Sequence, residues 1–190
     1  AWCKEHGRSI EDPSIVKSDW LPWLESRSWF RNGIGLADQY PVAIDNLLGI
    51  GNDKREFFEH IISRGVKPSA GYRALARIMD NGWIATALTT NFDHCLHRAV
   101  IIEASPPLLV EIRTPSDWVR FNASPANPQL IHIHGWVEHY SDMNLSTEVE
   151  HLAPEIVVRL RPLLRDHPLI VVGYRGMEPS VMTDLHYEQS

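Results

Sequence analysis

The spacing of apolar residues changes once along the chain. In the first part they recur every three or four positions, as in 42–48 and 72–79, which is the spacing of an amphipathic helix. In the second part, short continuous apolar runs alternate with further helical stretches. This change predicts a mainly helical portion over residues 1–80 and an α/β portion over residues 83–190, within a single domain.

Four apolar runs in the second portion predict buried strands. They are Trp83–Thr89, Leu108–Ile112, Leu130–Ile133 and Leu169–Val172. Runs without polar alternation are typical of parallel strands that are covered on both faces. The stretches between them predict helices over His94–Ile101, Asp117–Phe121 and Glu155–Arg165. Pro162 removes a backbone donor inside the last of these, so we expect that helix to be split there.

This alternation of strands and helices predicts an α/β fold: a Rossmann-like parallel sheet with helices on both faces, preceded by a helical segment. The formal net charge is −6, so no overall basic field attracts nucleic acid or an anionic membrane. The apolar runs are far too short to cross a bilayer, and the start of the chain lacks the apolar segment of a signal peptide. Cys3 and Cys95 cannot form a four-thiolate zinc site or a disulfide framework. These features predict a cytoplasmic protein.

Tryptophan is concentrated near the start of the chain. Four of the seven tryptophans lie within the first thirty residues, namely Trp2, Trp20, Trp23 and Trp29. Large rings of this kind are expected to pack a helical lid or the surface of a partner. The chain has no initiator methionine and ends in the middle of a pattern, so we expect it to be part of a longer protein.

Polar residues follow the predicted strands. The first strand leads into Thr89–Asp93, the third into His132–Gly135 and the fourth into Gly173–Gly176. In an open parallel sheet the carboxyl ends of the strands meet at one edge, and ligands bind in the crevice there. We therefore expect Asn91, Asp93, His134 and the loop that starts at Gly173 to converge.

Each of these residue types suits a task at a catalytic edge. Asn91 can orient a water or a ribose hydroxyl, because its amide both donates and accepts hydrogen bonds. Asp93 can accept from an amide or hydroxyl, and His134 is suited to act as a general base near neutrality. Gly135 and Gly173 let the backbone approach a ligand closely. The structural alternative is that Asn91 and Asp93 only cap the following helix and that the histidine is structural.

A metal site is a second alternative at the same edge. His132 and His134 lie two residues apart and therefore share a face of a strand. Further ligands could come from His94, His97 or Asp93. No carboxylate–histidine signature fixes such a site, so we expect His132 in the core and no bound metal.

Three stretches resemble the sirtuin-like NADase domains of bacterial anti-phage defence systems. Residues 72–93 resemble the helix, strand and Thr-Thr-Asn-Phe-Asp motif of that family. Leu130–Gly135 resembles its Leu-His-Gly motif, Asn144–Thr147 the short segment that follows, and Val171–Pro179 a glycine–tyrosine loop. The similarity runs from roughly residue 40 to residue 183, with three motifs in the right order, each at a predicted strand end.

The resemblance implies a function and a set of site residues. It implies that NAD⁺ is the substrate and is broken down to nicotinamide and ADP-ribose when a fused or bound sensor detects phage, in an oligomeric effector. It implies that Asn91 and His134 are the catalytic pair. The residues that it implies hold NAD⁺ are Thr90, Phe92, Asp93, Gly135, Gly173, Tyr174, Arg175 and Glu178.

The sequence departs from the family pattern in three ways. The family's first strand and its Gly-Ala-Gly-x-Ser phosphate loop are not found in these residues. Arg175 and Glu178 stand where Ser and Asp are usual. The zinc ribbon of protein-deacetylating sirtuins is missing, which favours an NADase. Two alternatives stay open: a non-catalytic module that senses NAD or ADP-ribose, and a sirtuin-type protein deacylase or ADP-ribosyltransferase.

Overall fold

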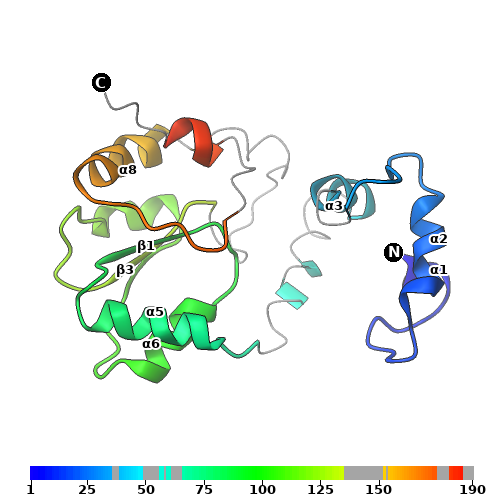
Figure 1. Ribbon diagram of the computed structural model, residues 1–190, viewed down its shortest axis with the longest axis horizontal. Helices are drawn as coiled ribbons and strands as arrows, with labels where there is room; N and C mark the ends of the chain where they lie inside the picture. Colours follow the sequence, from blue (N-terminus) through cyan, green and yellow to red (C-terminus); the bar gives the residue numbers. More distant parts are fainter. Residues whose placement is uncertain are drawn as a thin grey trace.

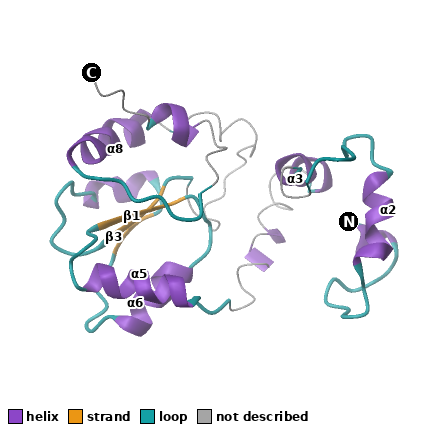
Figure 2. Ribbon diagram, viewed as in Figure 1, coloured by secondary structure: helices purple, strands orange, loops and turns teal. Residues whose placement is uncertain are grey.

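In the part of the chain that the structure describes, three parallel strands form one sheet that lies between helices (Figures 1 and 2). The computed structural model describes residues 1–35, 39–48, 56–57, 59–60, 66–134, 152, 154–174 and 180–185. The strands are β1 (Thr86–Thr89), β2 (Val110–Ile112) and β3 (Gln129–His132). Their order is β1-β3-β2, so that β3 pairs with both neighbours. The predicted parallel α/β arrangement is confirmed.

Helices surround this sheet and precede it. The elements are α1 (Trp2–Glu5), α2 (Lys17–Glu25), α3 (Tyr40–Leu47), α5 (Ala70–Asp80), α6 (Cys95–Glu103), the 3₁₀ helix η1 (Pro115–Arg120), α8 (Pro154–Asp166) and the π-helical turn η3 (Ser180–Asp184). Figure 2 shows α5 and α6 on one side of the sheet and α8 on the other. The sheet is therefore covered by helices on both faces, as the uninterrupted apolar runs predict.

The alternation of side chains along β3 divides the core into two layers. Leu130 packs with the buried residues of α5 and α6, and Ile131 packs on the opposite face with Leu160 and Leu163 of α8. Leu130 is 2% exposed and Ile131 is 0% exposed. Full burial of an aliphatic side chain stabilises a fold by about 1.5–3 kcal/mol, so β3 contributes to both layers.

Helix α5 follows its predicted course closely. Its apolar stripe buries Ala76 and Met79, and the helix ends at a turn where Gly82 has φ 75°. A positive φ favours glycine because glycine has no Cβ. The backbone N of Trp83 still donates to Ile78 O at 3.1 Å, which is a helix-terminating bond. Trp83 is 84% exposed, and β1 starts at Thr86 rather than at Trp83 as predicted.

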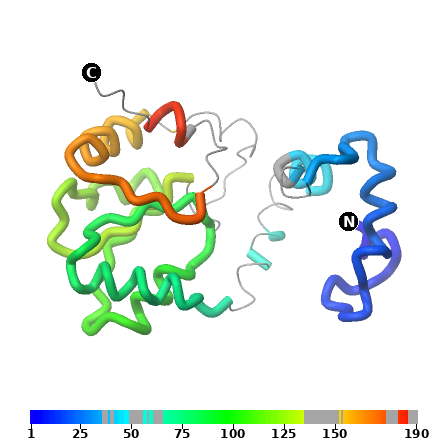
Figure 3. Tube along the Cα trace, in the orientation of Figure 1, coloured from blue at the N-terminus to red at the C-terminus, as the bar shows by residue number. Residues whose placement is uncertain are grey.

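The prediction of a fourth strand over Leu169–Val172 is wrong. This stretch follows α8 as an extended segment (Figure 3) and belongs to none of the described strands. Its four side chains are between 58% and 87% exposed. An apolar run becomes a strand only when a neighbouring strand supplies hydrogen-bond partners, and the sheet does not extend to this segment.

Two of the predicted helices differ in kind from the prediction. The stretch predicted as Asp117–Phe121 is the 3₁₀ helix η1, which starts at a capping box formed by Thr114 and Asp117. Helix α8 runs unbroken through Pro162, so the expected split is wrong. Proline removes the hydrogen bond to the carbonyl four residues earlier. That residue is Val158, which is 71% exposed, so water can bond to the freed carbonyl.

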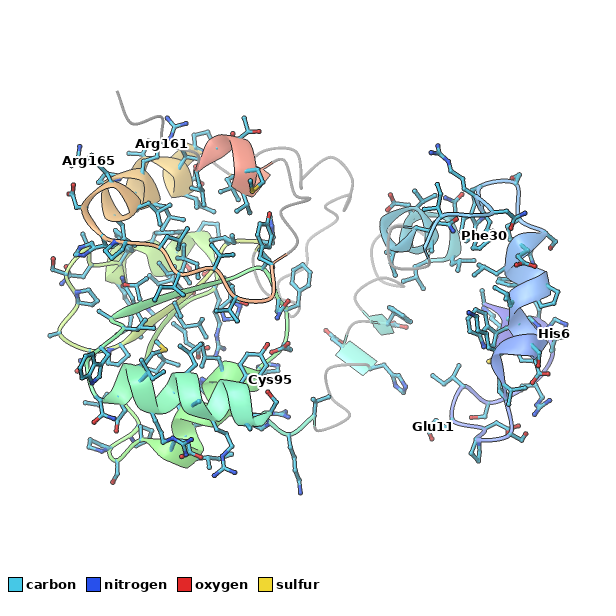
Figure 4. The ribbon with its side chains drawn as sticks, in the orientation of Figure 1. His6, Glu11, Phe30, Cys95, Arg161 and Arg165 are labelled. Atoms are coloured by element: carbon cyan, nitrogen blue, oxygen red, sulfur yellow. The ribbon has the colours of Figure 1, made fainter. Side chains whose placement is uncertain are left out.

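The π-helical turn η3 closes the α8 face of the sheet. Arg161, which Figure 4 labels on α8, donates from Nε to Asp184 O at 3.0 Å. Asp184 Oδ2 accepts from the backbone N of Leu152 at 2.6 Å. Leu185, immediately after the turn, packs in the same core cluster as the buried leucines of α8. These contacts attach the end of the described chain to the core.

The first helices lie apart from the sheet in Figure 1, and neither α1 nor α2 buries a residue. Trp23 Nε1 donates to Glu5 Oε2 at 2.6 Å, which joins α2 to α1. The Arg27 guanidinium lies 3.9 Å from the centre of the Trp23 ring. At least one of the clustered tryptophans therefore packs locally. No helix in the described ranges is long and apolar enough to span a membrane.

Candidate active site

The register of the sheet places Asn91 and His134 at the same edge. The last pair between β1 and β3 is Thr89 with His132, and Ile133 N donates to Thr89 O at 3.1 Å just beyond it. Asn91 and His134 each lie two residues past this pair. Neighbouring strands are about 4.8 Å apart, so the two segments that carry Asn91 and His134 leave the sheet from adjacent positions.

Asn91 is exposed, and two hydrogen bonds hold it. Its backbone N donates to Thr89 Oγ1 at 3.0 Å. Its side-chain Nδ2 donates to Tyr72 Oη, on α5, at 3.1 Å. The side chain thus joins the end of β1 to a different element, and Tyr72 is a contact that the sequence analysis missed.

Asp93 binds the start of the helix that follows it, as the structural alternative predicted. Its Oδ1 accepts from the backbone N of Cys95, the first residue of α6, at 2.8 Å. Such a bond satisfies one of the free donors at a helix start. Burial, and secondarily the Asp93 carboxylate, raises the pKa of the Cys95 thiol to about 11. This thiol is therefore protonated at neutral pH, which is the less nucleophilic form of cysteine.

Four other predicted contact residues lie within the described ranges, and those of the Gly173 loop do not follow a strand of the sheet. Thr90, Phe92 and Tyr174 are half-buried, whereas Gly173 is exposed and has φ 69°. Phe92 packs against Ile44 of α3, so one residue of the strand-end loop contacts the helical portion. Gly135, Arg175 and Glu178 lie outside the described residues.

His132 is a core residue, as predicted, and faces a buried carboxylate. It is 4% exposed, and its Nε2 lies 3.7 Å from Glu111 Oε1 on β2. Glu111 also pairs with His97 Nδ1 at 2.8 Å and with the Arg113 guanidinium. Half-buried His134 follows directly after this group, in the turn that ends β3.

Glu111 remains ionised in spite of its burial. Burial alone would raise the pKa of this carboxyl. The contacts with His132 and Arg113, together with the His97 ring, outweigh burial and lower the pKa to about 2. The sequence motifs do not include Glu111. A lone carboxylate inside the predicted strand Leu108–Ile112 is nevertheless a signal, since an ionised group is buried only with partners.

The alternative of a metal centre gains no support from this geometry. Within the ranges that the structure describes, no group of three or more His, Cys, Asp or Glu side chains is placed to hold a metal ion. His97 faces Glu111, and Asp93 binds the start of α6. Two of the three residues considered as further ligands, His97 and Asp93, therefore have other contacts.

Comparison with known protein families matches the α/β portion. The SIR2-like domain family matches residues 85–187, a stretch that starts just before β1, includes all three strands and extends past η3. Comparison with curated proteins finds no match. The matched range contains Asn91, His134 and the Gly173 loop, and it extends over more than half of the chain's 190 residues. The chain belongs to the SIR2-like domain family, whose members act on NAD⁺.

Proposed function

We propose that the protein hydrolyses NAD⁺ to nicotinamide and ADP-ribose, as an effector of bacterial anti-phage defence. The catalytic part of this proposal rests on one observation. Asn91 and His134 each lie two residues past the last paired residues of the neighbouring strands β1 and β3. Membership of an NAD⁺-using family supports the substrate. The defence role rests on the resemblance of the strand-end motifs.

The chemistry of NAD⁺ explains why such a small set of groups suffices. Nicotinamide is cationic in NAD⁺ and leaves as a neutral base, so no general acid is needed. Ordinary glycosidases, in contrast, use a pair of carboxylic acids. The site must orient the ribose, stabilise a transition state that resembles an oxocarbenium ion, and admit one water.

The proposed roles follow from the residue types. Asn91 orients the attacking water or a ribose hydroxyl through its amide. His134 accepts the proton that the water loses when its oxygen bonds to the ribose carbon released by nicotinamide. Asp93 contacts the carboxamide of nicotinamide. The products are nicotinamide, ADP-ribose and one proton, so the reaction balances without another reactant.

Substitution of the catalytic pair tests the proposal in the intact protein. Loss of a positioning group or base removes a few kcal/mol of transition-state stabilisation, so Asn91→Ala and His134→Ala should each lower NAD⁺ turnover by about 100-fold or more. The measurement is chromatographic quantification of nicotinamide and ADP-ribose. Asn81→Ala and His167→Ala change exposed residues of the same types and should leave turnover unchanged.

Binding and group-transfer assays on the same protein separate the alternatives. Saturable binding of NAD⁺ or ADP-ribose without nicotinamide release would replace the hydrolase with a sensing module. Deacylation of an acylated peptide, or transfer of ADP-ribose to protein, would indicate the sirtuin-type alternative. Near wild-type turnover in a folded Asn91→Ala variant would remove Asn91 from the mechanism.

The defence role has a separate test in cells. Bacteria that express the wild-type protein with its sensor partner should lose NAD⁺ on phage infection, and phage yield should fall. Bacteria that express Asn91→Ala should keep both NAD⁺ and phage yield at the level of cells without the protein. Equal protection by both forms would contradict the effector role.

A further inference from the structure

The contact between Tyr72 and Asn91 joins a helix to the proposed catalytic edge. We propose that Tyr72 is a positioning residue, which fixes the side-chain amide of Asn91 in the orientation needed for NAD⁺ hydrolysis. This inference rests on the proposed function. Tyr72 Oη accepts from Asn91 Nδ2 at 3.1 Å, and the two residues are 19 positions apart in the sequence.

The two ends of an asparagine amide are chemically different. Nδ2 only donates hydrogen bonds, and Oδ1 only accepts them. Because Nδ2 donates to Tyr72, Oδ1 is the end that can accept from a water or a ribose hydroxyl. An exposed asparagine would otherwise exchange between rotamers and present either end. The backbone bond from Asn91 N to Thr89 Oγ1, at 3.0 Å, fixes the other side of the residue.

Tyr72 lies on α5, a helix that is fixed against α6. Its ring packs against the core cluster that includes Ala76 and Met79 of α5. Arg73 and Arg77 of α5 both pair with Glu103 of α6, and Arg77 Nη1 lies 3.0 Å from Glu103 Oε2. The hydroxyl that receives Asn91 is therefore fixed by packing and by ion pairs that attach α5 to α6.

The protonation of Tyr72 suits this role. Burial, and secondarily the Asp93 carboxylate, raises the pKa of the Tyr72 hydroxyl above its ordinary value of 10. At neutral pH the hydroxyl is consequently neutral, and it can accept from Asn91 while keeping its own proton to donate. Phenylalanine has the same ring but lacks the accepting oxygen.

Tyr72→Phe in the intact protein tests the proposal. We expect kcat for NAD⁺ hydrolysis to fall by about 2- to 12-fold, the range for loss of one hydrogen bond. KM should change by less than about twofold, since the ring stays in place. Because Tyr72 acts through Asn91, adding Tyr72→Phe to Asn91→Ala should lower kcat no further.

A matched control separates positioning from stability. Thr86 lies at the other end of β1, and its Oγ1 accepts from Gln129 Nε2 at 2.8 Å. Thr86→Val also removes a hydroxyl that accepts a hydrogen bond, so it should lower the thermal unfolding temperature but leave kcat unchanged. Tyr72→Phe should lower kcat but leave the thermal unfolding temperature unchanged.

A spectroscopic measurement tests the contact without turnover. In ¹⁵N-labelled protein, the side-chain amide resonances of Asn91 are identified by their loss in Asn91→Ala. They should shift in Tyr72→Phe and stay in place in Thr86→Val. Unshifted resonances in Tyr72→Phe would overturn the contact.

Wild-type kcat in Tyr72→Phe, with Asn91→Ala inactive, would overturn the positioning role while the proposed function stands. Absence of turnover in the wild-type protein would overturn the proposed function and the role of Tyr72 with it.

Discussion

Asp93 combines a structural contact with a proposed catalytic one. Its Oδ1 binds the backbone at the start of α6, and the resemblance assigns its carboxylate to NAD⁺. Helix capping needs only a small side chain with an accepting oxygen, whereas a contact that depends on charge needs the carboxylate. The two roles can therefore be separated by choosing the replacement.

Asp93→Ala and Asp93→Ser form the corresponding pair of variants. Loss of the hydrogen bond to Cys95 N in Asp93→Ala should lower the free energy of unfolding by about 1 kcal/mol, measured by urea denaturation. Serine restores an accepting oxygen, so Asp93→Ser should recover most of this stability. If the carboxylate contacts NAD⁺, KM should be raised in both variants. Recovery of KM together with stability in Asp93→Ser would assign Asp93 to the fold alone.

Sequence reasoning at the scale of single residues identifies motif residues better than their supports. Asn91 and His134 follow predicted strands, so the rule that parallel strands end at one edge is enough to bring them together. Tyr72 appears in the sequence only as a member of an apolar helical stripe. Its contact with Asn91 depends on how α5 lies against β1, which no local pattern encodes. Glu111 likewise depends on its partners His97 and His132, which come from other elements.

At the scale of elements, local periodicity predicts helices more reliably than strands. The predicted stripe of α5 and the predicted helix at α6 are both confirmed, because a helix satisfies its hydrogen bonds within itself. A strand depends on a neighbour, which explains why Leu169–Val172 is extended but unpaired. Pro162 shows the reverse: a local rule predicts a break, and an exposed helix face tolerates the lost bond.

The packing of α5 on α6 depends on small side chains, and this gives an element-scale prediction. Ala76 of α5 and Ala99 of α6 are both 0% exposed in the same core cluster. Ala99→Leu inserts extra methylene groups into filled space and should destabilise the fold by about 1–3 kcal/mol. Ala70→Leu, at the exposed first position of α5, should change stability by less than about 0.5 kcal/mol. Chemical denaturation followed by circular dichroism measures both, and equal stability of the two variants would contradict this packing.

At the scale of the whole molecule, the family match and the change in periodicity agree. Residues 85–187 match the SIR2-like domain, and the sheet and its covering helices other than α5 lie within that range. Helix α5 precedes the matched range yet supplies Tyr72 to the proposed site. The proposed catalytic unit therefore extends beyond the matched residues toward the start of the chain.

Ionised carboxylates near the sheet make the stability of the whole molecule sensitive to acid. Several contacts oppose the effect of burial on each of two groups and lower its pKa to about 2: His132 and Arg113 for Glu111, and the backbone N–H groups of Arg113 and Thr114 for Asp117. The ordinary values are 4.5 and 3.8. A pKa that is lower in the folded state stabilises the fold above the ordinary value. This contribution is lost as the pH falls toward the folded value.

The fold should therefore lose stability progressively between about pH 4.5 and pH 2, with Glu111 as a main contributor. The glutamine side chain of Glu111→Gln does not ionise, so Arg113 loses its buried counter-charge. This variant should therefore be less stable than the wild type at pH 7. As the pH falls from about 4.5 to 2, the free energy of unfolding of this variant should decrease less steeply than that of the wild type. The difference between the two free energies should narrow by on the order of 3 kcal/mol or less. Urea denaturation at a series of pH values measures this slope.

Asp166→Asn is the control, because Asp166 pairs with Arg165 while its side chain is 57% exposed, and water screens such pairs. Parallel loss of stability in the wild type and in Glu111→Gln would show that the buried cluster does not set the acid sensitivity, and would move the cause to Asp117 and the surface carboxylates.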